Sequence, residues 1–242
     1  MMDERELRQR IAAVQERIAA AARRAGRAAD EITLVAVTKT QGPEVVAAAC
    51  AAGLRAFGEN RVEEAIPKVR AVAALLGEAA AADLRWHMIG HLQSRKAGDV
   101  FPWAAMVHSV DSVKLAVRLN RFAVAAGRRL PILLEVNVAA EPSKYGFAAD
   151  DLAAHVEAIA ALPGLQIQGL MTVAPIAADP ETVRPVFAEL RRLRDDLARR
   201  FPGLDWRHLS MGMTDDFEVA IEEGATIVRI GRAIFGERVE TK

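Results

Sequence analysis

The stretch TLVAVTKTQGPEVVAAACAAGLRAFGEN, residues 33–60, indicates the fold more directly than any other part of the chain. It opens with a short apolar run, 33–38, which is typical of a buried strand and ends at Lys39. A proline suited to a first helical turn follows, and the small-residue helix that it begins stops at Gly53. A second strand-like run comes next. This order predicts two parallel strands joined by a helical crossover.

The same unit recurs along the chain. Eight segments read as strands: 33–38, 54–58, 86–90, 106–110, 132–138, 167–173, 206–212 and 226–231. A leading helix is indicated by apolar residues at helical spacing: Leu7, Ile11, Val14 and Ile18. In a chain of 242 residues this pattern predicts an α/β fold, a single closed (β/α)8 TIM barrel with an extra N-terminal helix. The alternative is a doubly wound open sheet. We expect one domain, residues 1–242.

Cues for helix ends separate most of these strands. Segment 42–53 begins with a proline, and segment 110–127 has Asp111 or Ser112 as a natural cap and Gly127 as a stop. Similar cues mark two later segments, 147–164 and 179–203. Strands and helices therefore alternate, as a parallel sheet requires.

Composition and charge argue against several classes of protein. Lysine plus arginine equal aspartate plus glutamate, at 32 each, so no net field favours nucleic acid or an acidic membrane as partner. The lone Cys50 cannot form an internal disulfide and is expected in the core of a reduced, intracellular protein. No apolar run approaches the roughly 18 residues of a membrane-spanning helix. We therefore expect a cytoplasmic protein.

In a TIM barrel the chemistry takes place where the strands end and the loops to the helices begin. Polar residues follow almost every predicted strand at this end: Lys39, Glu59, Asn60, His87, His91, His108, Ser109, Asn137 and Thr172. So many polar side chains on one rim predict a bound ligand.

The loops after the last two strands predict a phosphate site. Ser210 to Thr214, SMGMT, joins a glycine-containing turn to a helix expected to start near Asp215, and IGRA places Gly231 and the amide of Arg232 at another helix start. Amides at helix starts have no partner within the helix and attract anions, and barrels often bind phosphate with these two loops. The alternative is that these residues only form turns and caps.

Lys39 at the end of the first strand is a candidate amine nucleophile. A lysine that faces an apolar pocket has its pKa lowered and can attack an aldehyde. The simpler interpretation is a lysine that extends to solvent or pairs with a carboxylate such as Glu59. A lysine beside a phosphate site suggests a Schiff base with a phosphorylated carbonyl compound, which describes both phosphosugar aldolases and pyridoxal phosphate proteins.

Arg229 favours the second of these classes. It lies two residues before Gly231, hence on the same face of the strand and one step deeper in the barrel, where a guanidinium can meet a ring nitrogen. A Schiff-base lysine together with an arginine or aspartate at the pyridine nitrogen is a pyridoxal phosphate arrangement. The alternative is that Arg229 pairs with a buried carboxylate such as Glu135.

Together these motifs resemble one family. VAVTKT, FGENRVEEA, WHMIGHLQSRK, HSVDS, EVNVAAEPSKYGF, GLMTVAP and LSMGMTDDFEVAIEEGATIVRIGRAIFG occur over about 34–237 in the order found in the pyridoxal phosphate homeostasis proteins, also called the YggS/PROSC family. The resemblance implies a barrel of the alanine racemase N-terminal domain type that binds pyridoxal 5′-phosphate.

The resemblance also implies roles for individual residues. Lys39 matches the lysine that forms the Schiff base, and Arg229 matches the arginine facing the pyridine nitrogen. Ser210, Gly231 and Arg232 match the phosphate-binding loops. Asn60 matches a pocket residue, with His87 and Met211 as near matches. Many relatives have QSNK at 93–96 and MSxD at 213–216, where this chain has QSRK and MTDD, and threonine keeps the hydroxyl group.

The sequence provides no clear second group for catalysis. Racemisation needs two well-placed groups that transfer protons on opposite faces of the substrate. Alanine racemases take one of these groups, a tyrosine, from a second domain that is not expected here. The only tyrosine of this chain is Tyr145. An arginine at the ring nitrogen also weakens the electron sink. We therefore expect a protein of vitamin B6 homeostasis that holds the cofactor and acts as a carrier to apo-enzymes, with weak racemase-type activity at most.

Two other functions stay open at this stage. One is a fold-type III amino-acid racemase or decarboxylase, and the other is a phosphosugar aldolase or isomerase, which would leave Arg229 without a use. His108 and His208 have no carboxylate or cysteine at ligand spacing, so no metal is expected. A monomer is expected.

Overall fold

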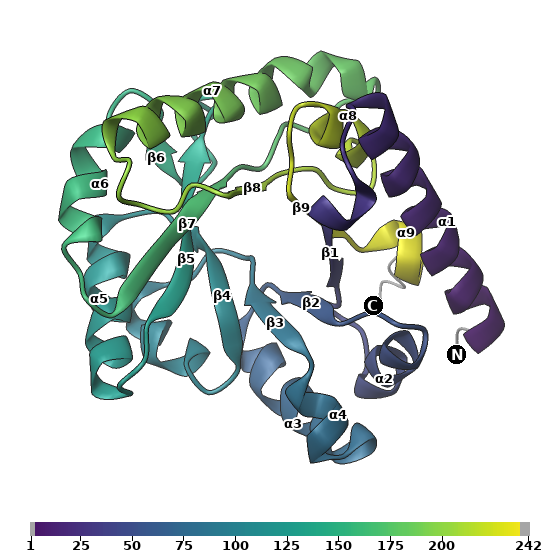
Figure 1. The fold of residues 1–242 in the computed structure, drawn as a ribbon. Coiled ribbons are helices and arrows are strands. Elements are labelled where there is room, and N and C mark those ends of the chain that lie inside the picture. The colour runs from purple at the N-terminus through teal and green to yellow at the C-terminus, as the bar shows by residue number, and fades with distance from the viewer. Residues whose placement is uncertain (1–2, 238–242) are drawn as a thin grey trace.

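A computed structural model describes residues 3–237 of the chain, and its strands form a ring (Figure 1). The strands are β1 (Thr33–Val37), β2 (Ala56–Glu59), β3 (Arg85–Met88), β4 (Ala104–Val110), β5 (Leu130–Asn137), β6 (Phe147–Ala148), β7 (Leu165–Met171), β8 (His208–Ser210) and β9 (Ile227–Ile230).

The ring is a closed parallel barrel. Its order is β4-β3-β2-β1-β9-β8-β7-β5, and a further pairing of β4 with β5 joins its two ends. All of these pairs are parallel. Each of the eight predicted strands is confirmed, and the open-sheet alternative is wrong. The two-residue β6 was not predicted, and it pairs with β5 outside the ring.

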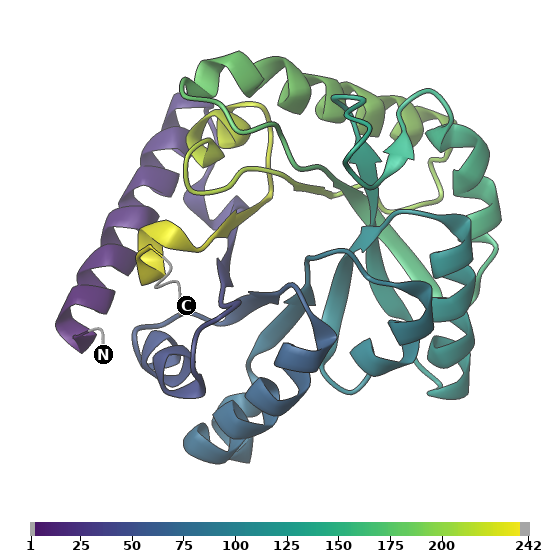
Figure 2. The same ribbon diagram turned by 180° about the vertical axis from the view of Figure 1, so that it is seen from behind.

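Helices cover the outside of the ring, as Figure 2 shows from behind. The α-helices are α1 (Glu4–Arg24), α2 (Pro43–Ala51), α3 (Val62–Leu76), α4 (Glu78–Ala82), α5 (Val113–Ala125), α6 (Leu152–Ala160), α7 (Arg184–Arg200), α8 (Phe217–Glu222) and α9 (Arg232–Phe235). Three 3-10 helices lie between them: η1 (Ala29–Glu31), η2 (Ser94–Val100) and η3 (Pro180–Val183).

Most of the predicted helix ends are confirmed. Pro43 is the first residue of α2, and the Ser112 hydroxyl accepts from the amide of Leu115 at the start of α5. Three predictions need correction. Segment 147–164 is helical only over α6, because its first two residues form β6. The helix expected near Asp215 begins at Phe217, because 214–216 form turns, and segment 179–203 divides into η3 and α7.

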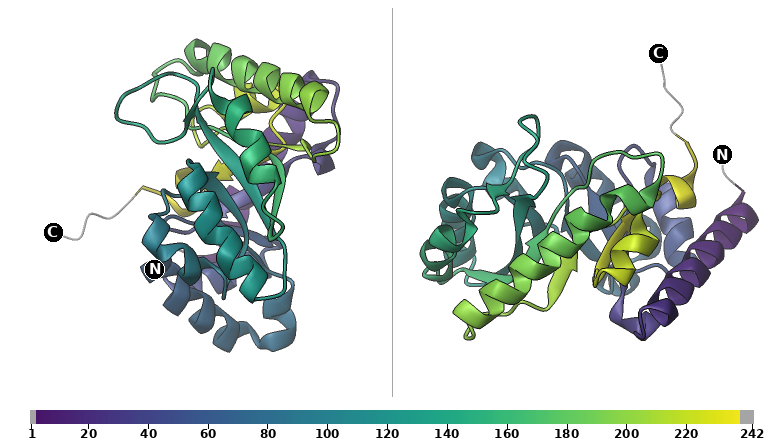
Figure 3. Two further views of the ribbon diagram at one scale, coloured as in Figure 1. Left: turned by 90° about the vertical axis from the view of Figure 1, so that its left-hand side faces the viewer. Right: turned by 90° about the horizontal axis from the view of Figure 1, so that it is seen from above.

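The extra N-terminal helix compensates for two short ones. α8 and α9 have only six and four residues, too few to cover the outer faces of their strands. α1 packs against both of them, and Figure 3 shows it along this side of the ring. The predicted apolar stripe of α1 is buried: Leu7, Ile11, Val14 and Ile18. Burial of such side chains contributes roughly 1.5–3 kcal/mol each.

Apolar contacts lie on both sides of the barrel wall. A large cluster fills the layer between strands and helices, while a small one inside the ring joins five strands through Val35, Met106, Leu133, Met171 and Ile227. Gly169 of β7 lies opposite His208 of β8, at a φ of 140°, and a Cβ there would overlap the His208 carbonyl. A glycine is therefore required at this close approach of two strands.

Cys50 is buried, as expected, and the three tryptophans are buried as well. None of the helices between residues 3 and 237 is long and apolar enough to cross a lipid bilayer. The single domain predicted for 1–242 extends at both ends beyond the described residues and stays a prediction.

Candidate functional site

Neighbouring strands carry most of the predicted site residues. β2, β1, β9 and β8 are adjacent in the ring, and at their carboxyl ends lie Asn60, Lys39, Gly231 with Arg232, and Ser210. Arg229 of β9 is opposite Val35 of β1, an interior residue. Lys39 follows the end of β1 by two residues and lies in the turn after that strand.

Lys39 lies in a tight turn that is held on both sides. Thr38 donates its hydroxyl to Glu59 Oε1 at 2.6 Å, and the amide of Thr40 donates to Glu64 Oε1. Thr40 has a φ of 68°, a left-handed conformation that a β-branched residue rarely adopts, at a cost of about 1–3 kcal/mol. The bond from Glu64 to this amide compensates for part of that strain. The half-buried Lys39 is therefore carried by a fixed backbone.

A buried lysine joins both sides of this turn. Lys68 of α3 donates from Nζ to the Thr38 carbonyl at 2.6 Å, to Glu59 Oε1 at 2.7 Å and to Glu64 Oε1 at 2.8 Å. Burial raises the pKa of Glu59, while Lys68 and Thr38 act in the opposite direction. The carboxylate proposed as an alternative partner for Lys39 thus bonds to Thr38 and Lys68.

Arg229 is fully enclosed at the bottom of the site. It donates to Ser210 Oγ at 2.6 Å and to the Thr172 carbonyl at 2.8 Å. Burial lowers its pKa to about 10, although the nearby charges of Glu135 and Asp216 raise it. The guanidinium still carries its charge near neutral pH. Its hydrogen bonds go to Ser210 and Thr172 rather than to Glu135, the partner suggested as an alternative.

A row of hydrogen bonds continues from Ser210 across the barrel. His108 Nδ1 lies 2.9 Å from Ser210 Oγ, and His108 Nε2 lies 2.9 Å from His87 Nδ1. Burial lowers the pKa of His87 to about 4 and that of His108 well below its usual value, so both rings are neutral.

The direction of the protons in this row follows from Arg229. A guanidinium can only donate, so Ser210 Oγ accepts from Arg229. Among the described residues the acceptor within reach of the Ser210 hydroxyl proton is His108 Nδ1, so we assign that proton to this bond. His108 then donates from Nε2 to His87 Nδ1, and the remaining proton of His87 is on Nε2. One buried cation therefore sets the tautomers of two histidines.

Several buried oxygen atoms at this end of the barrel have no hydrogen-bond partner among residues 3–237. They include Glu59 Oε2, Glu135 Oε2 and Asn60 Oδ1. Burial raises the pKa of Glu135 to about 7, with Asp111 adding to the increase and Arg229 opposing it. Unpartnered buried polar atoms are rare and often mark the place of a ligand or an ion.

The loops after β8 and β9 form one continuous surface. The amide of Met213 donates to Asp216 Oδ1 at 2.6 Å, and Arg232 forms an ion pair with Asp215. Gly212 has a φ of 92°, and a Cβ there would lie 2.9 Å from Phe217 Cα. The turn therefore needs glycine, which keeps this loop close to α8. The amides of a short loop and the guanidinium of Arg232 can together bind an anion.

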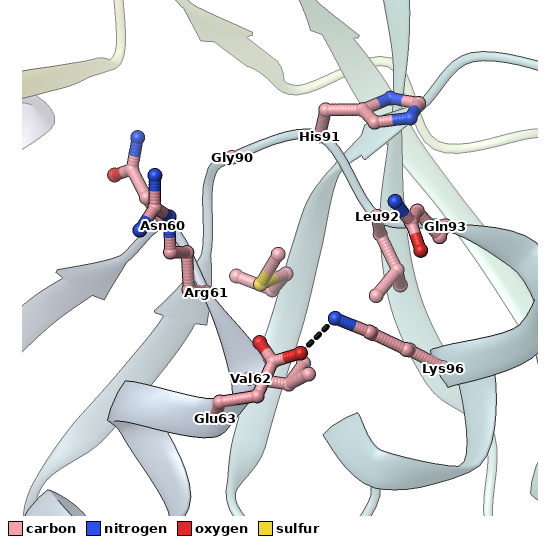
Figure 4. Close-up of a pocket in the computed structure, with 10 residues that line it drawn as sticks. Asn60, Arg61, Val62, Glu63, Gly90, His91, Leu92, Gln93 and Lys96 are labelled. Carbon is pink, nitrogen blue, oxygen red and sulfur yellow. Dashed lines mark hydrogen bonds and ion pairs between the residues drawn. The ribbon is translucent and has the colours of Figure 1, made fainter.

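A cavity of about 620 Å³ opens next to Asn60 (Figure 4). It is lined by Arg61, Val62, Glu63, Met88, Gly90, His91, Leu92, Gln93 and Lys96. Figure 4 shows Lys96 and Glu63 pointing toward each other, and they form an ion pair. Of the six predicted site residues, Asn60 alone lines this cavity, so the cavity is a neighbour of the lysine–arginine site and not its centre.

Sequence reasoning missed the role of Lys68 behind the Lys39 turn and the hydrogen bonds that join Ser210, His108 and His87. A signal existed for Lys68, because it falls on the buried stripe of α3 with Val62, Ala65 and Val72, where a charge needs a partner. The contact of His108 in β4 with Ser210 in β8 joins residues 102 positions apart and had no local signal.

The chain is similar to known proteins over almost its whole length. A family model described as alanine racemase, N-terminal domain, matches residues 10–239. A pyridoxal phosphate homeostasis protein of Aquifex aeolicus is 43% identical over 95% of this chain and 97% of its own length. One from Pseudomonas aeruginosa is 45% identical over 94% of each chain. The structure of PipY from Synechococcus elongatus with PLP bound has a TM-score of 0.81 and 35% identity, covering 95% of this chain and all of that one.

Proposed function

Because this chain belongs to the pyridoxal phosphate homeostasis protein family, within the alanine racemase N-terminal domain group, we propose that it binds pyridoxal 5′-phosphate in vitamin B6 homeostasis. The observation that supports this most directly is the placement of a lysine, a buried arginine and two loops on the adjacent strands β1, β9 and β8. These groups correspond to the aldehyde, the ring nitrogen and the phosphate of that cofactor.

Lys39 is proposed to hold the cofactor as a Schiff base. The Lys39 amine would hold the aldehyde carbon of the bound cofactor through a C=N bond to Nζ, with one water molecule released. The braced turn supports this role, because an amine on a fixed backbone reaches its target with a smaller loss of entropy.

Arg229 is proposed to face the ring nitrogen. It carries its charge near neutral pH, as a pKa of about 10 indicates, so the ring nitrogen next to it accepts a hydrogen bond instead of a proton. An unprotonated ring is a weaker electron sink. This supports binding of the cofactor over turnover of amino acids.

The phosphate is assigned to Gly231, Arg232 and the loop that begins at Ser210. The Ser210 hydroxyl gives its proton to His108, so its part is to fix the loop and Arg229 rather than to donate to the phosphate. The donors would be loop amides and Arg232, whose side chain is 47% exposed and free to turn from Asp215 toward an anion. Asn60 is proposed to contact the cofactor with its unpartnered Oδ1.

A comparison of two ligands tests the phosphate assignment. The protein is titrated with pyridoxal 5′-phosphate and with pyridoxal, and the absorbance band of the Schiff base is followed. Two or more charge-assisted hydrogen bonds of about 1.5 kcal/mol each predict affinity about 10²-fold higher for the phosphate form. Equal affinities would contradict the role of the two loops. Exchange of an amino acid's α-proton well above the rate with free cofactor would support a racemase instead.

We propose three finer points on the same basis. The protein acts as a carrier to apo-enzymes, which is supported by a site at the open rim of the barrel. A monomer is sufficient, since all six residues come from one chain. The lone free Cys50 supports a reducing compartment such as the cytoplasm.

A further inference from the structure

The turn that carries Lys39 depends on one buried ammonium group. Lys68 Nζ reaches the Thr38 carbonyl and also the two carboxylates that bind the flanking residues, Glu59 on Thr38 and Glu64 on Thr40. Lys68 and Glu59 are almost fully buried, at 6% and 0% exposure. The residues before and after Lys39 are thus tied to the same cation, which comes from α3 and not from the strand itself.

We propose that Lys68 is a positioning residue for Lys39, a role that rests on the proposed function. It fixes the turn after β1 so that the Lys39 amine meets the cofactor aldehyde. It does this from behind the turn, through Glu59, Glu64 and the Thr38 carbonyl, and none of its three bonds is made to Lys39 itself.

Three physical consequences of removing Lys68 support this role. Glu59 would lose its buried cationic partner and keep the hydrogen bond from Thr38, which favours rearrangement of that side chain. The Thr38 carbonyl would keep only the Gln41 amide. The left-handed Thr40 would then relax more readily toward an ordinary conformation, since the network that holds it is weakened.

A relaxed turn should slow the covalent capture of the cofactor by Lys39 and leave its non-covalent binding unchanged. Covalent capture needs the amine at the aldehyde, and an error of about 1 Å in such an arrangement can cost about 10²-fold in rate. The proposed ring and phosphate contacts come from β8, β9 and their loops, which Lys68 does not touch. Non-covalent binding should therefore survive.

The experiment separates these two steps. Lys68→Met and Thr38→Val proteins are compared with the wild type, after thermal melts show that each is folded. Thr38→Val removes the hydroxyl bond to Glu59 and leaves the buried ion pair intact, so it serves where Lys68→Met does not fold. Rapid mixing with pyridoxal 5′-phosphate measures how fast the Schiff-base band appears. Pyridoxine 5′-phosphate, which has no aldehyde, measures non-covalent affinity.

Arg27→Met is the matched control. Like Lys68, Arg27 donates from its cationic group to backbone carbonyls, here those of Ile221 and Ala225. These contacts lie shortly before β9, at the opposite end of the barrel. Its loss should change neither measurement.

We expect capture by Lys68→Met to be slower by about ten-fold or more, with a smaller decrease for Thr38→Val, while affinity for pyridoxine 5′-phosphate stays within about two-fold. Capture at the wild-type rate would overturn the proposal. An equal loss in both measurements would also overturn it, because Lys68 would then be merely structural. Absence of the band in the wild type would instead refute the proposed function.

Discussion

Arg229 is the residue whose burial has the widest effect. A lone buried charge is expensive, and here two of the guanidinium's five N–H donors are used by Ser210 Oγ and the Thr172 carbonyl, with Glu135 and Asp216 supplying compensating charge. The same guanidinium sets the direction of the hydrogen bonds through His108. The residue proposed to face the cofactor ring thus also organises the hydrogen bonds of Ser210, His108 and His87.

Glu135 should make stability depend on pH in a direction that can be measured. Its pKa in the folded protein is raised to about 7 from an ordinary 4.5, so the folded state holds its proton more tightly than the unfolded state. The stabilisation that this tighter proton binding gives the folded state is fully present below pH 4.5 and is lost as pH rises through 7. Glu135→Gln removes this pH dependence, because glutamine does not titrate. The free energy of unfolding of the variant should therefore rise relative to that of the wild type by about 3 kcal/mol between those limits.

Urea unfolding at several pH values, for both proteins, measures this difference. Other titrating groups are common to the two proteins and cancel in the comparison. The quantity to follow is the free energy of unfolding of Glu135→Gln minus that of the wild type. If this difference stays constant from pH 4.5 to 8, or decreases as the pH rises, the assignment of a raised pKa to Glu135 is contradicted.

For single residues, the sequence predicted which residues belong to the candidate site better than it predicted their contacts. Lys39 and Arg229 were recognisable because each places a charge on an apolar strand. The partner of Glu59 could not be chosen between Lys39 and Lys68 without knowing how α3 turns toward β1. That rotation is set by packing over the whole helix.

Among the elements, α1 illustrates how a helix outside the repeating pattern becomes part of the barrel. It covers the side where α8 and α9 are short, and its buried face is regular enough to be predicted from spacing alone. The short length of α8 was not predictable in this way, since the turn at 214–216 is closed by a hydrogen bond that the Met213 amide donates to the Asp216 carboxylate.

Ile11→Ala should destabilise the barrel through the loss of this contact. Ile11 is 2% exposed, and removing such a side chain leaves a cavity that costs about 2–5 kcal/mol. Val117→Ala on α5 is the control, because Val117 is 48% exposed and its change should stay within about 0.5 kcal/mol. Urea unfolding at neutral pH measures both. Equal effects of the two substitutions would show that α1 is not a part of the cooperative core.

For the molecule as a whole, the fold was predictable because its signal is repeated. Eight strand–helix units along one chain favour a closed ring strongly, even where single boundaries are wrong by two residues, as for β8. Closure itself, β4 against β5, follows from the number of units and not from any local feature. The ring then fixes which loops meet, and this is why Arg229 and Ser210 were expected together.

The two ends of the barrel carry different kinds of residues. The amino ends of the strands are tied by contacts such as Arg27 with the Ile221 and Ala225 carbonyls, while the carboxyl ends carry Lys39, Arg229 and the two loops proposed to bind phosphate. The proposed capture of an aldehyde would benefit from this arrangement, because the rigid ring keeps Lys39 and the loops after β8 and β9 at a constant separation.

Chemical trapping of the cofactor tests the central claim most directly. The protein is incubated with pyridoxal 5′-phosphate, reduced with borohydride and digested, and the modified peptide is identified by mass spectrometry. We expect the adduct on Lys39, its loss in Lys39→Ala, and its retention in a Lys96→Ala control. An adduct that persists in Lys39→Ala, or one found in the wild type on another lysine instead, would contradict the proposed site.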